Sequence, residues 1–355
     1  AGAGRRAKPG LAEGGRVTSA SRTAPLPPWL ASQQSALLRQ RGHAWLLQGP
    51  AGLGQWELGL ALVRAWLCES AGAATEGACG QCPSCHAIAV HAHADLLVLM
   101  PEVRLLALGW PLPEKAQAEI DDKKRKPSKE IRVDALRQAV EFCQRTSARG
   151  RGKAVLVYPA EDMNAIAANT LLKTLEEPAG SVRFVLATEA AHQLLPTIRS
   201  RCLAHTMVWP QPLAAQTWLE SQGLSAADAQ LALRAMGGSP QQALALARAP
   251  QGLQLAHDFA QWVRAGDMAA LGSLAPQELL GWLQKLCHDL MCLAQGAAPR
   301  YFLPAHLPPA PRLAVLLRWS QALNQEMRVA EHPFQPALTV QALVVQARSV
   351  LHSKN

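Results

Sequence analysis

Four cysteines lie close together in the sequence with the spacing of a metal site. Cys68 precedes Cys79, Cys82 and Cys85, and the last three recur every third residue. Such a run presents three thiolates from one tight loop, and Cys68 can complete the tetrahedron that zinc prefers. Four sulfur ligands leave no position for a reacting water, so the pattern predicts a structural Zn²⁺ site. The alternatives are an iron–sulfur cluster, a redox or spare thiol group, and a histidine in place of one cysteine (His86, His91 or His93).

A glycine-rich segment has the spacing of a phosphate-binding loop but lacks its chemistry. Gly49 to Gly54 read GPAGLG, which matches the start of the pattern G-x-x-x-x-G-K-[ST]. The backbone N–H groups of such a loop can face a phosphate, and the lysine and hydroxyl that follow hold the outer phosphates and Mg²⁺. Here the two positions are Gln55 and Trp56, which supply neither. We therefore expect the turn of a nucleotide-binding fold, with no ATP bound by this chain.

A second part of an ATP site is also missing. The strand predicted over residues 154–158 should end in a pair of acids that serve Mg²⁺ and the attacking water. It ends in Tyr158–Pro159, and Glu161 and Asp162 come only later, on the following turn. The glycine turn alone would be no more than a tight turn, but its place after a strand favours the α/β fold.

The elements that position these motifs alternate along the chain. Apolar runs predict strands at residues 44–48, 95–100, 154–158, 183–188 and 205–208. Helical periodicity predicts helices at residues 29–40, 55–66, 133–143 and 165–177, the last with Ile166, Leu171, Leu172 and Leu175 toward the core. This alternation is typical of an α/β fold with a doubly wound parallel sheet.

The chain divides into an α/β part and two helical parts. We expect a disordered basic tail at 1–24, an α/β domain at 25–209 with the cysteine module at 68–86, a small helical domain at 210–250 and a larger helical domain at 251–355. Residues 101–130 hold four prolines and a lysine run, which predicts an insertion or loop. A proline-rich connection near 296–311 interrupts the last helices.

Composition limits the function classes. The 355 residues are 49% hydrophobic, yet no apolar run approaches the roughly 20 residues that cross a bilayer. The N-terminus lacks the apolar core of a signal peptide, so we expect a cytoplasmic protein without membrane contact. The net charge of +9 is concentrated in residues 1–24, 121–132 and 145–153, which suits contact with a polyanion such as DNA. Solvated flexible loops are the alternative.

Three sequence strings resemble a known family. NTLLKTLEEP (169–178), FVLAT (184–188) and IRSRC (198–202) resemble the clamp-loader group of AAA+ proteins, which includes the bacterial delta-prime and gamma/tau subunits. The cysteine module resembles one that these two bacterial subunits share. The missing lysine and hydroxyl resemble delta-prime rather than gamma/tau. The motifs cover residues 25–250, and beyond 250 the resemblance is one of architecture.

The resemblance implies a fold and a role for particular residues. It implies an AAA+ α/β domain followed by an all-α lid and an all-α collar domain. Arg201 of the SRC string would complete the ATP site of a neighbouring gamma/tau subunit, Thr188 takes the family's sensor-1 place, and Gln241 stands where an active subunit has the sensor-2 arginine. A surface salt bridge is the alternative role for Arg201.

The resemblance also implies an assembly. The chain would be a non-catalytic subunit of the DNA polymerase III clamp loader in DNA replication, with the gamma/tau and delta subunits, the sliding clamp and primer-template DNA as partners. Two other functions compete with this one. The first is an ATP-hydrolysing, gamma/tau-like clamp-loader subunit, and the second is a zinc-containing nucleic-acid-binding module with no clamp-loader role.

Overall fold

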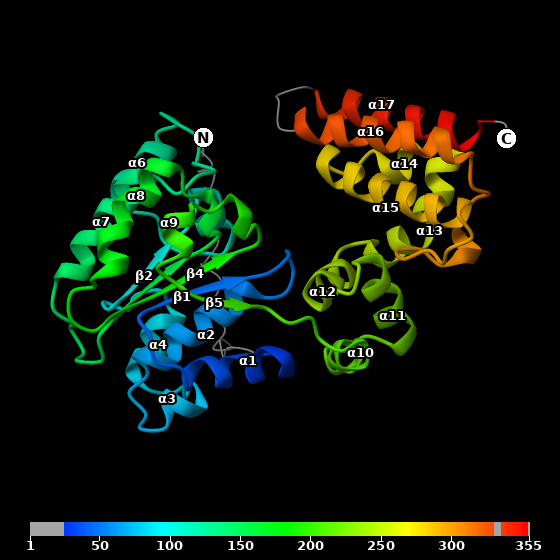
Figure 1. Cartoon of the computed structure of the whole chain (residues 1–355). Helices are drawn as coiled ribbons and strands as arrows, with labels where there is room; N and C mark the ends of the chain where they lie inside the picture. The colour runs from blue at the N-terminus through cyan, green and yellow to red at the C-terminus, as the bar shows by residue number, and fades with distance from the viewer. Residues whose placement is uncertain (1–24, 330–334, 354–355) are drawn as a thin grey trace, which may run out of the picture.

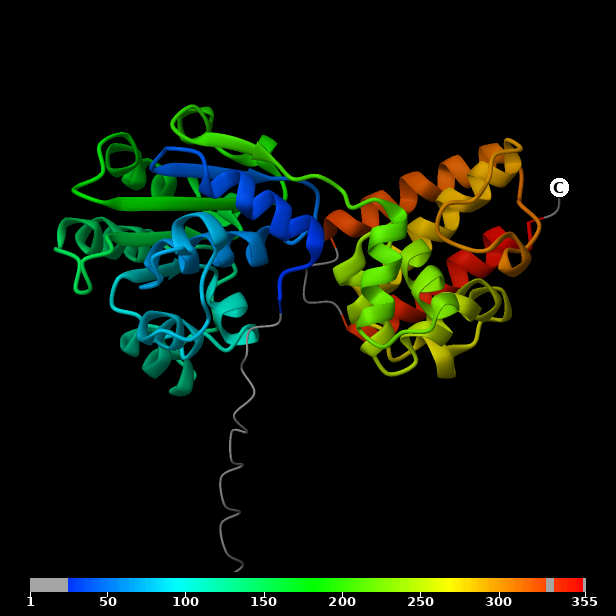
Figure 2. The same cartoon turned by 90° about the horizontal axis from the view of Figure 1, so that it is seen from below.

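The computed structural model describes residues 25–329 and 335–353 (Figure 1). The predicted basic tail, residues 1–24, lies outside the described residues. Figure 2 shows two parts side by side: a sheet with its covering helices, and a group of helices formed by residues 212–329 and 336–351. Of the described residues, no helix is long and apolar enough to cross a membrane.

Five strands form one parallel sheet. They are β1 (Ala44–Gln48), β2 (Leu96–Leu99), β3 (Lys153–Val157), β4 (Val182–Thr188) and β5 (Leu203–Thr206). The order across the sheet is β2-β3-β4-β1-β5, and every neighbouring pair is parallel. All five residues of β3 are buried, because a strand covered on both faces must be apolar on both sides. The predicted doubly wound parallel sheet is confirmed.

The last strand begins two residues earlier than predicted. The sequence predicts 205–208, whereas β5 pairs Leu203 with Trp45 and Thr206 with Gln48. As an edge strand, β5 is largely exposed, so hydrophobicity does not mark its position. The apolar residues that suggested the strand lie past its end, where the N–H of Met207 donates to the carbonyl of Gln48 at 2.8 Å.

Helices cover both faces of the sheet. Neighbouring residues of β1 point to opposite faces, so Leu46 and Leu47 belong to different cores. The helices on the Leu47 face are α1 (Pro28–Leu38) and α2 (Gln55–Leu67), and those on the Leu46 face are α7 (Val133–Gln144) and α8 (Ala165–Glu176).

One expected core residue of α8 is exposed. Ile166 has 69% of its surface exposed, whereas Leu171 and Leu175 are fully buried and Leu172 is partly buried. A residue five positions before Leu171 lies about 140° away around a helix with 3.6 residues per turn. The prediction for Ile166 was therefore wrong, and Ala167 occupies the buried position instead.

The segment 101–130 is an insertion that contains two short helices, α5 (Glu102–Ala107) and α6 (Glu114–Asp121). Arg125, part of the expected basic run, turns inward between them. Its Nη2 donates to Glu102 at 2.8 Å and its Nε donates to Glu119 at 2.7 Å. Arg125 therefore links the two helices of the insertion. Burial alone would raise the pKa of Glu102, but the hydrogen bonds and positive charge of Arg125 outweigh this effect and lower it.

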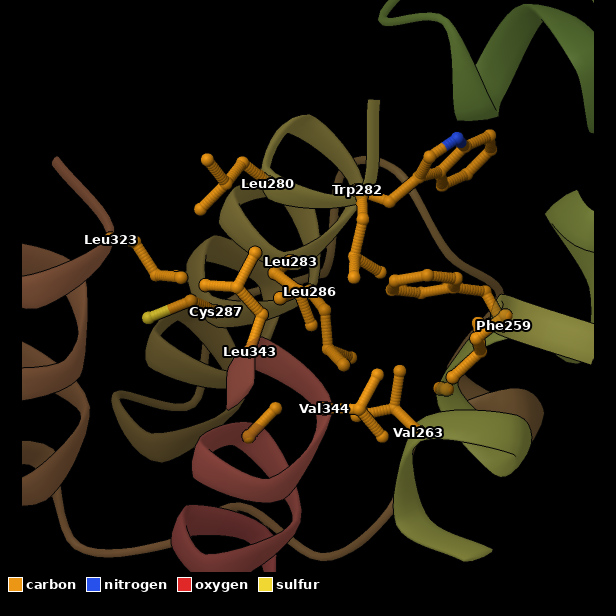
Figure 3. Packing of buried hydrophobic residues seen from close by; sticks show 14 of the residues in the cluster. Phe259, Val263, Leu280, Trp282, Leu283, Leu286, Cys287, Leu323, Leu343 and Val344 are labelled. Atoms are coloured by element: carbon orange, nitrogen blue, oxygen red, sulfur yellow. The ribbon is translucent and has the colours of Figure 1, made fainter. Parts of the chain in front are cut away.

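The described residues that follow β5 contain helices and no strand. They are α10 (Pro212–Ser221), α11 (Ala226–Ala235), α12 (Pro240–Arg248), α13 (Gly252–Ala265), α14 (Met268–Leu271), α15 (Pro276–Ala294), α16 (Leu313–Val329) and α17 (Pro336–Leu351). Figure 3 shows Phe259, Trp282, Leu286 and Val344 meeting in the larger core. Ala235 of α11 and the partly buried Leu246 of α12 join this core too, so these two helices pack against the later ones. The predicted domain limits stay predictions.

A buried carboxylate fixes the proline-rich connection. Asp289 of α15 is fully buried, and its two oxygens accept the backbone N–H groups of Arg300 at 2.8 Å, Tyr301 at 2.7 Å and Phe302 at 2.8 Å. The connection thus has a defined path across the helices, and Phe302 enters the core.

We expect Asp289→Ala to lower the free energy of unfolding by about 3 kcal/mol, because three N–H groups lose a charged acceptor in a buried place. Urea denaturation with circular dichroism would measure it. Glu278→Ala on the exposed side of the same helix is the control and should cost less than about 1 kcal/mol. Equal effects of the two substitutions would contradict this account of the connection.

Candidate functional site

The expected glycine turn lies at the carboxyl end of the expected strand and leads into the expected helix. β1 ends at Gln48, and α2 begins at Gln55. Gly52 and Gly54 have φ of +86° and +93°, a conformation that favours glycine. The turn therefore has the glycine-dependent form of a phosphate-binding loop, and the next residues decide whether it can hold a phosphate.

The side chain of Gln55 fills this turn. Only 1% of the residue is exposed, and its Nε2 donates to the carbonyls of Gly49 and Pro50, each at 2.8 Å. A turn that binds phosphate directs N–H groups at the ligand, whereas this turn directs two carbonyls at its own side chain. The place of the expected lysine is taken by a neutral amide that closes the loop.

Aromatic side chains occupy the space beside the turn. The ring of Trp56 stacks on Tyr158 with centroids 5.9 Å apart, and its edge meets Trp110 at the same distance. The hydroxyl of Tyr158 donates to Glu189 at 2.6 Å, and the guanidinium of Arg104 lies 5.1 Å from the Tyr158 ring. Burial, together with this bond to Glu189, raises the pKa of Tyr158. The carboxylate of Glu189 is thus engaged by the hydroxyl of Tyr158 within this cluster.

Helix α12 closes the turn from the other side. Ser239, at its N-terminus, donates from Oγ to the carbonyl of Gly52 at 2.8 Å. A Cβ at Gly52 would lie 2.4 Å from Oγ of Ser239, so glycine is required here for space as well as for backbone conformation. Gln241 forms a side-chain hydrogen bond with Glu57 of α2, and burial raises the pKa of that carboxyl.

The cavity that remains carries little positive charge. Its volume is about 410 Å³. Among the described residues around it, Arg104 is the one cation, and the carboxyls of Glu57 and Glu189 line the same cavity. A polyphosphate would meet two acids and one base there, in a cleft whose walls are mostly apolar. The geometry thus brings Gly54, Gln55, Trp56, Tyr158 and Gln241 together, as the family arrangement implies.

The displaced acids do not replace the missing pair. Glu161 and Asp162 lie on the 3₁₀ turn η1 (Ala160–Asp162) that follows β3, as expected. One oxygen of Glu161 accepts the N–H of Glu189 at 2.8 Å, so this acid supports the chain after β4. Thr188, at the end of β4, is fully buried, and its hydroxyl accepts the N–H of Ala190 at 3.2 Å.

Arg201 lies apart from the cleft, on the turn that follows α9 (Pro196–Arg199). Its Nε and Nη2 donate to one oxygen of Glu176 at 3.1 and 2.9 Å, and its Nη1 donates to the carbonyl of Thr197 at 3.0 Å. The side chains of Arg201 and Glu176 are 30% and 58% exposed. A pair this exposed is worth about 0–1 kcal/mol, so little free energy is lost when Glu176 releases Arg201.

The four predicted metal ligands converge. Their sulfurs all lie within 4.8 Å of one another, and Cys68 Sγ is 3.5 Å from Cys79 Sγ and 3.8 Å from Cys82 Sγ. Zinc–sulfur bonds of about 2.3 Å in a tetrahedron place sulfurs about 3.8 Å apart. The cluster therefore has the dimensions of a four-thiolate metal site.

Local structure and neighbouring bonds hold the cysteines in place. Cys68 follows α2, Cys82 caps α4 (Pro83–Ala89), and a loop with α3 (Ala73–Glu76) lies between them. Backbone N–H groups of Glu69 and Cys79 point at the sulfurs of Cys82 and Cys68, at 3.5 and 3.4 Å. N–H groups directed at sulfur stabilise the thiolate that a metal needs.

A second cluster of possible donors, which the sequence did not predict, has another role. His288, Asp289 and Cys292 lie close together on α15. Both oxygens of Asp289 are already engaged by the backbone of residues 300–302, so the carboxylate is committed to the fold. Sequence reasoning also missed Glu57 and Glu189, since only tertiary packing brings them to the cleft.

Comparisons with known proteins identify the family of this chain. The model of the family described as DNA polymerase III, delta subunit, matches residues 31–208. A DNA polymerase III subunit delta' from Pseudomonas aeruginosa is 38% identical over 60% of this chain and 58% of that protein. The one from Escherichia coli is 34% identical over 76% of this chain and 78% of its own length. The DNA polymerase III subunit tau of Escherichia coli is 32% identical over 45% of this chain and 21% of that subunit.

We expect Gln55→Ala to lower the free energy of unfolding by about 2–4 kcal/mol, because two carbonyls of the turn lose their donor and a cavity replaces the buried amide. Urea denaturation followed by tryptophan fluorescence would report it. Gln230→Ala, on the exposed surface of α11, is the control and should change little. A Gln55 variant as stable as the control would show that the amide does not hold the turn.

Proposed function

Because the chain belongs to the DNA polymerase III delta-prime family, we propose that it is a clamp-loader subunit that does not hydrolyse ATP and lends Arg201 to a neighbour. The observation that carries this proposal is the contrast between two parts of one fold. The cleft is closed from within by Gln55 and Trp56, whereas Arg201 stands on another element in a weak, partly exposed ion pair.

The chemistry of arginine suits this role. Its guanidinium is planar, always charged and able to donate several hydrogen bonds at once, so it can neutralise charge that develops on a transferring phosphoryl group. In the isolated chain the side chain of Arg201 is held by Glu176 and the carbonyl of Thr197. If a γ-phosphate displaced Glu176, Arg201 would contact an anion of higher charge than the carboxylate.

The proposed assembly follows from the family. The partners are the gamma/tau and delta subunits, with the sliding clamp and primed DNA bound by the whole complex. The helices from α13 to α17 would join the collar, and the α/β part would present Arg201 to the ATP of a gamma/tau subunit. Such a subunit needs a fixed shape more than it needs a bound nucleotide. A cleft that is closed by its own side chains provides this fixed shape.

We also propose that Cys68, Cys79, Cys82 and Cys85 hold a structural Zn²⁺. All four donors are sulfur, and the two contacts of 3.5 and 3.8 Å match the spacing of a tetrahedral thiolate site. The ion would tie the end of α2 to α4 and so fix a loop that has little core of its own, since its core cluster consists of Cys68, Ala73 and Cys85.

A substitution at Arg201 tests the trans role. In a complex rebuilt with gamma/tau, delta, clamp and primed DNA, Arg201→Ala should slow hydrolysis at the site it completes by about a thousandfold. Arg201→Lys should restore little, because a lysine cannot reproduce the planar fork. ATP turnover and clamp loading are the measurements.

Arg199→Ala is the matched control, since Arg199 is an exposed arginine two residues away. It should leave turnover unchanged. Gel filtration must show that every variant assembles. A complex that contains Arg201→Ala and hydrolyses ATP at the full DNA-stimulated rate would overturn the proposed role.

Metal analysis tests the zinc site. Purified full-length chain should contain one zinc per molecule, and Cys82→Ser should release it and lower the melting temperature. Cys143→Ala removes a buried thiol outside the cluster and should keep the zinc. Iron in place of zinc, or a Cys82→Ser variant with full metal content, would refute the assignment.

A further inference from the structure

A larger groove lies at the opposite end of the sheet from the glycine turn. Its volume is about 890 Å³, compared with about 410 Å³ for the closed cleft. Gly42, Gly152 and Ser181 line it, and these residues come just before β1, β3 and β4. One wall is residues 70–75 of the cysteine module, where α3 packs beside α1 (Figure 1).

Four arginines from three segments line this groove. Arg39 and Arg41 follow the end of α1, Arg151 lies in the loop before β3, and Arg183 is the second residue of β4. Of the two internal basic segments that the sequence singled out, 145–153 contributes Arg151 and 121–132 contributes nothing. The other three arginines are far apart in sequence, and only the fold brings them together.

These arginines are not balanced by acids. Of the described residues that line the groove, none is an aspartate or glutamate. Arg39 donates to the carbonyl of Ser35 and Arg151 to that of Glu69, but none of the four forms an ion pair with a described carboxylate. Four guanidinium groups around one depression produce a positive potential that attracts an extended anion.

Aromatic rings add a second kind of contact. Trp66 is half-buried in the groove wall, and the guanidinium of Arg183 lies 5.4 Å from its ring. Trp45, 2% exposed, also lines the groove, and its indole Nε1–H has no acceptor among the described residues. This N–H is buried beneath the surface of the groove, so the aromatic contact with a ligand rests on the ring of Trp66.

We propose that this groove binds a single strand of nucleic acid through its phosphodiester backbone, with a base stacked at Trp66 and Arg183. Arginines that follow a backbone beside a stacking platform are the general features of proteins that bind single strands without sequence selectivity. A walled groove accepts one strand more readily than the convex surface of a duplex, whose bases are not free to stack. The proposal rests on the proposed function, which brings the chain to primed DNA.

Binding of a labelled single-stranded DNA oligonucleotide to the full-length chain, followed by fluorescence anisotropy over a range of salt, tests the groove. The double variant Arg39→Ala/Arg41→Ala should bind at least about tenfold more weakly, and the slope of log K against log salt should decrease by about 1.4. Trp66→Leu keeps an apolar side chain and should weaken binding with the salt slope unchanged.

Arg137→Ala/Arg318→Ala is the matched control, because it removes the same charge from exposed sites outside the groove. It should bind like the wild type. Three results would overturn the proposal: no binding by the wild type, equal loss in both double variants, or a duplex bound as tightly as the single strand. Displacement by a glutamate-rich peptide as effective as displacement by unlabelled DNA would assign the groove to an acidic protein segment instead.

The same variants separate this proposal from the proposed function. In the rebuilt clamp loader, the groove variants keep Arg201 and should support ATP turnover that still depends on it at saturating primed DNA. Loss of single-strand binding with normal maximal turnover supports the groove. If Arg201→Ala had no effect on ATP turnover while single-strand binding stayed intact, the trans-arginine role would be refuted and the groove proposal would stand.

Discussion

The side-chain amide of Gln55 donates to the carbonyls of Gly49 and Pro50, and the cleft depends on these two bonds. Because these bonds satisfy the two carbonyls of the turn, the turn can keep its conformation without a bound phosphate. Trp56 packs on Tyr158, and Ser239 ties helix α12 to Gly52. Helix α12 is thus held on the turn by a side chain of the same chain. A subunit whose shape does not depend on a nucleotide suits the proposed role.

The two ends of the parallel sheet have opposite electrostatic character. At the carboxyl ends of the strands, where this fold ordinarily binds its ligand, Glu57 and Glu189 flank a narrow apolar cleft. At the amino ends, four arginines surround a groove of about twice that volume. Arg201 belongs to neither and stands in an ion pair that costs little to exchange. Family membership, a closed cleft and an available arginine together support a subunit that acts on its neighbours.

Much of the fold could be predicted from local pattern, because buried parallel strands are apolar throughout and helices follow a 3.6-residue period. Edge strand β5 was misplaced and Ile166 was assigned to the wrong face, since neither edge strands nor helix rotation are fixed by hydrophobicity alone. The cysteine cluster was predictable because its ligands are close in sequence. The bonds of Gln55, the Ser239 contact and the arginine groove were not, because they join segments that only tertiary packing brings together.

Isothermal titration of the full-length chain with Mg²⁺ and ATP tests the central claim most directly. The claim is that the cleft is closed from within and that the fold is complete without a nucleotide. The account predicts no saturable heat of binding at ATP concentrations up to several millimolar, which corresponds to a binding free energy weaker than about −4 kcal/mol. A saturable site with a micromolar Kd, lost on substitution at Gly54 or Gln55, would contradict it.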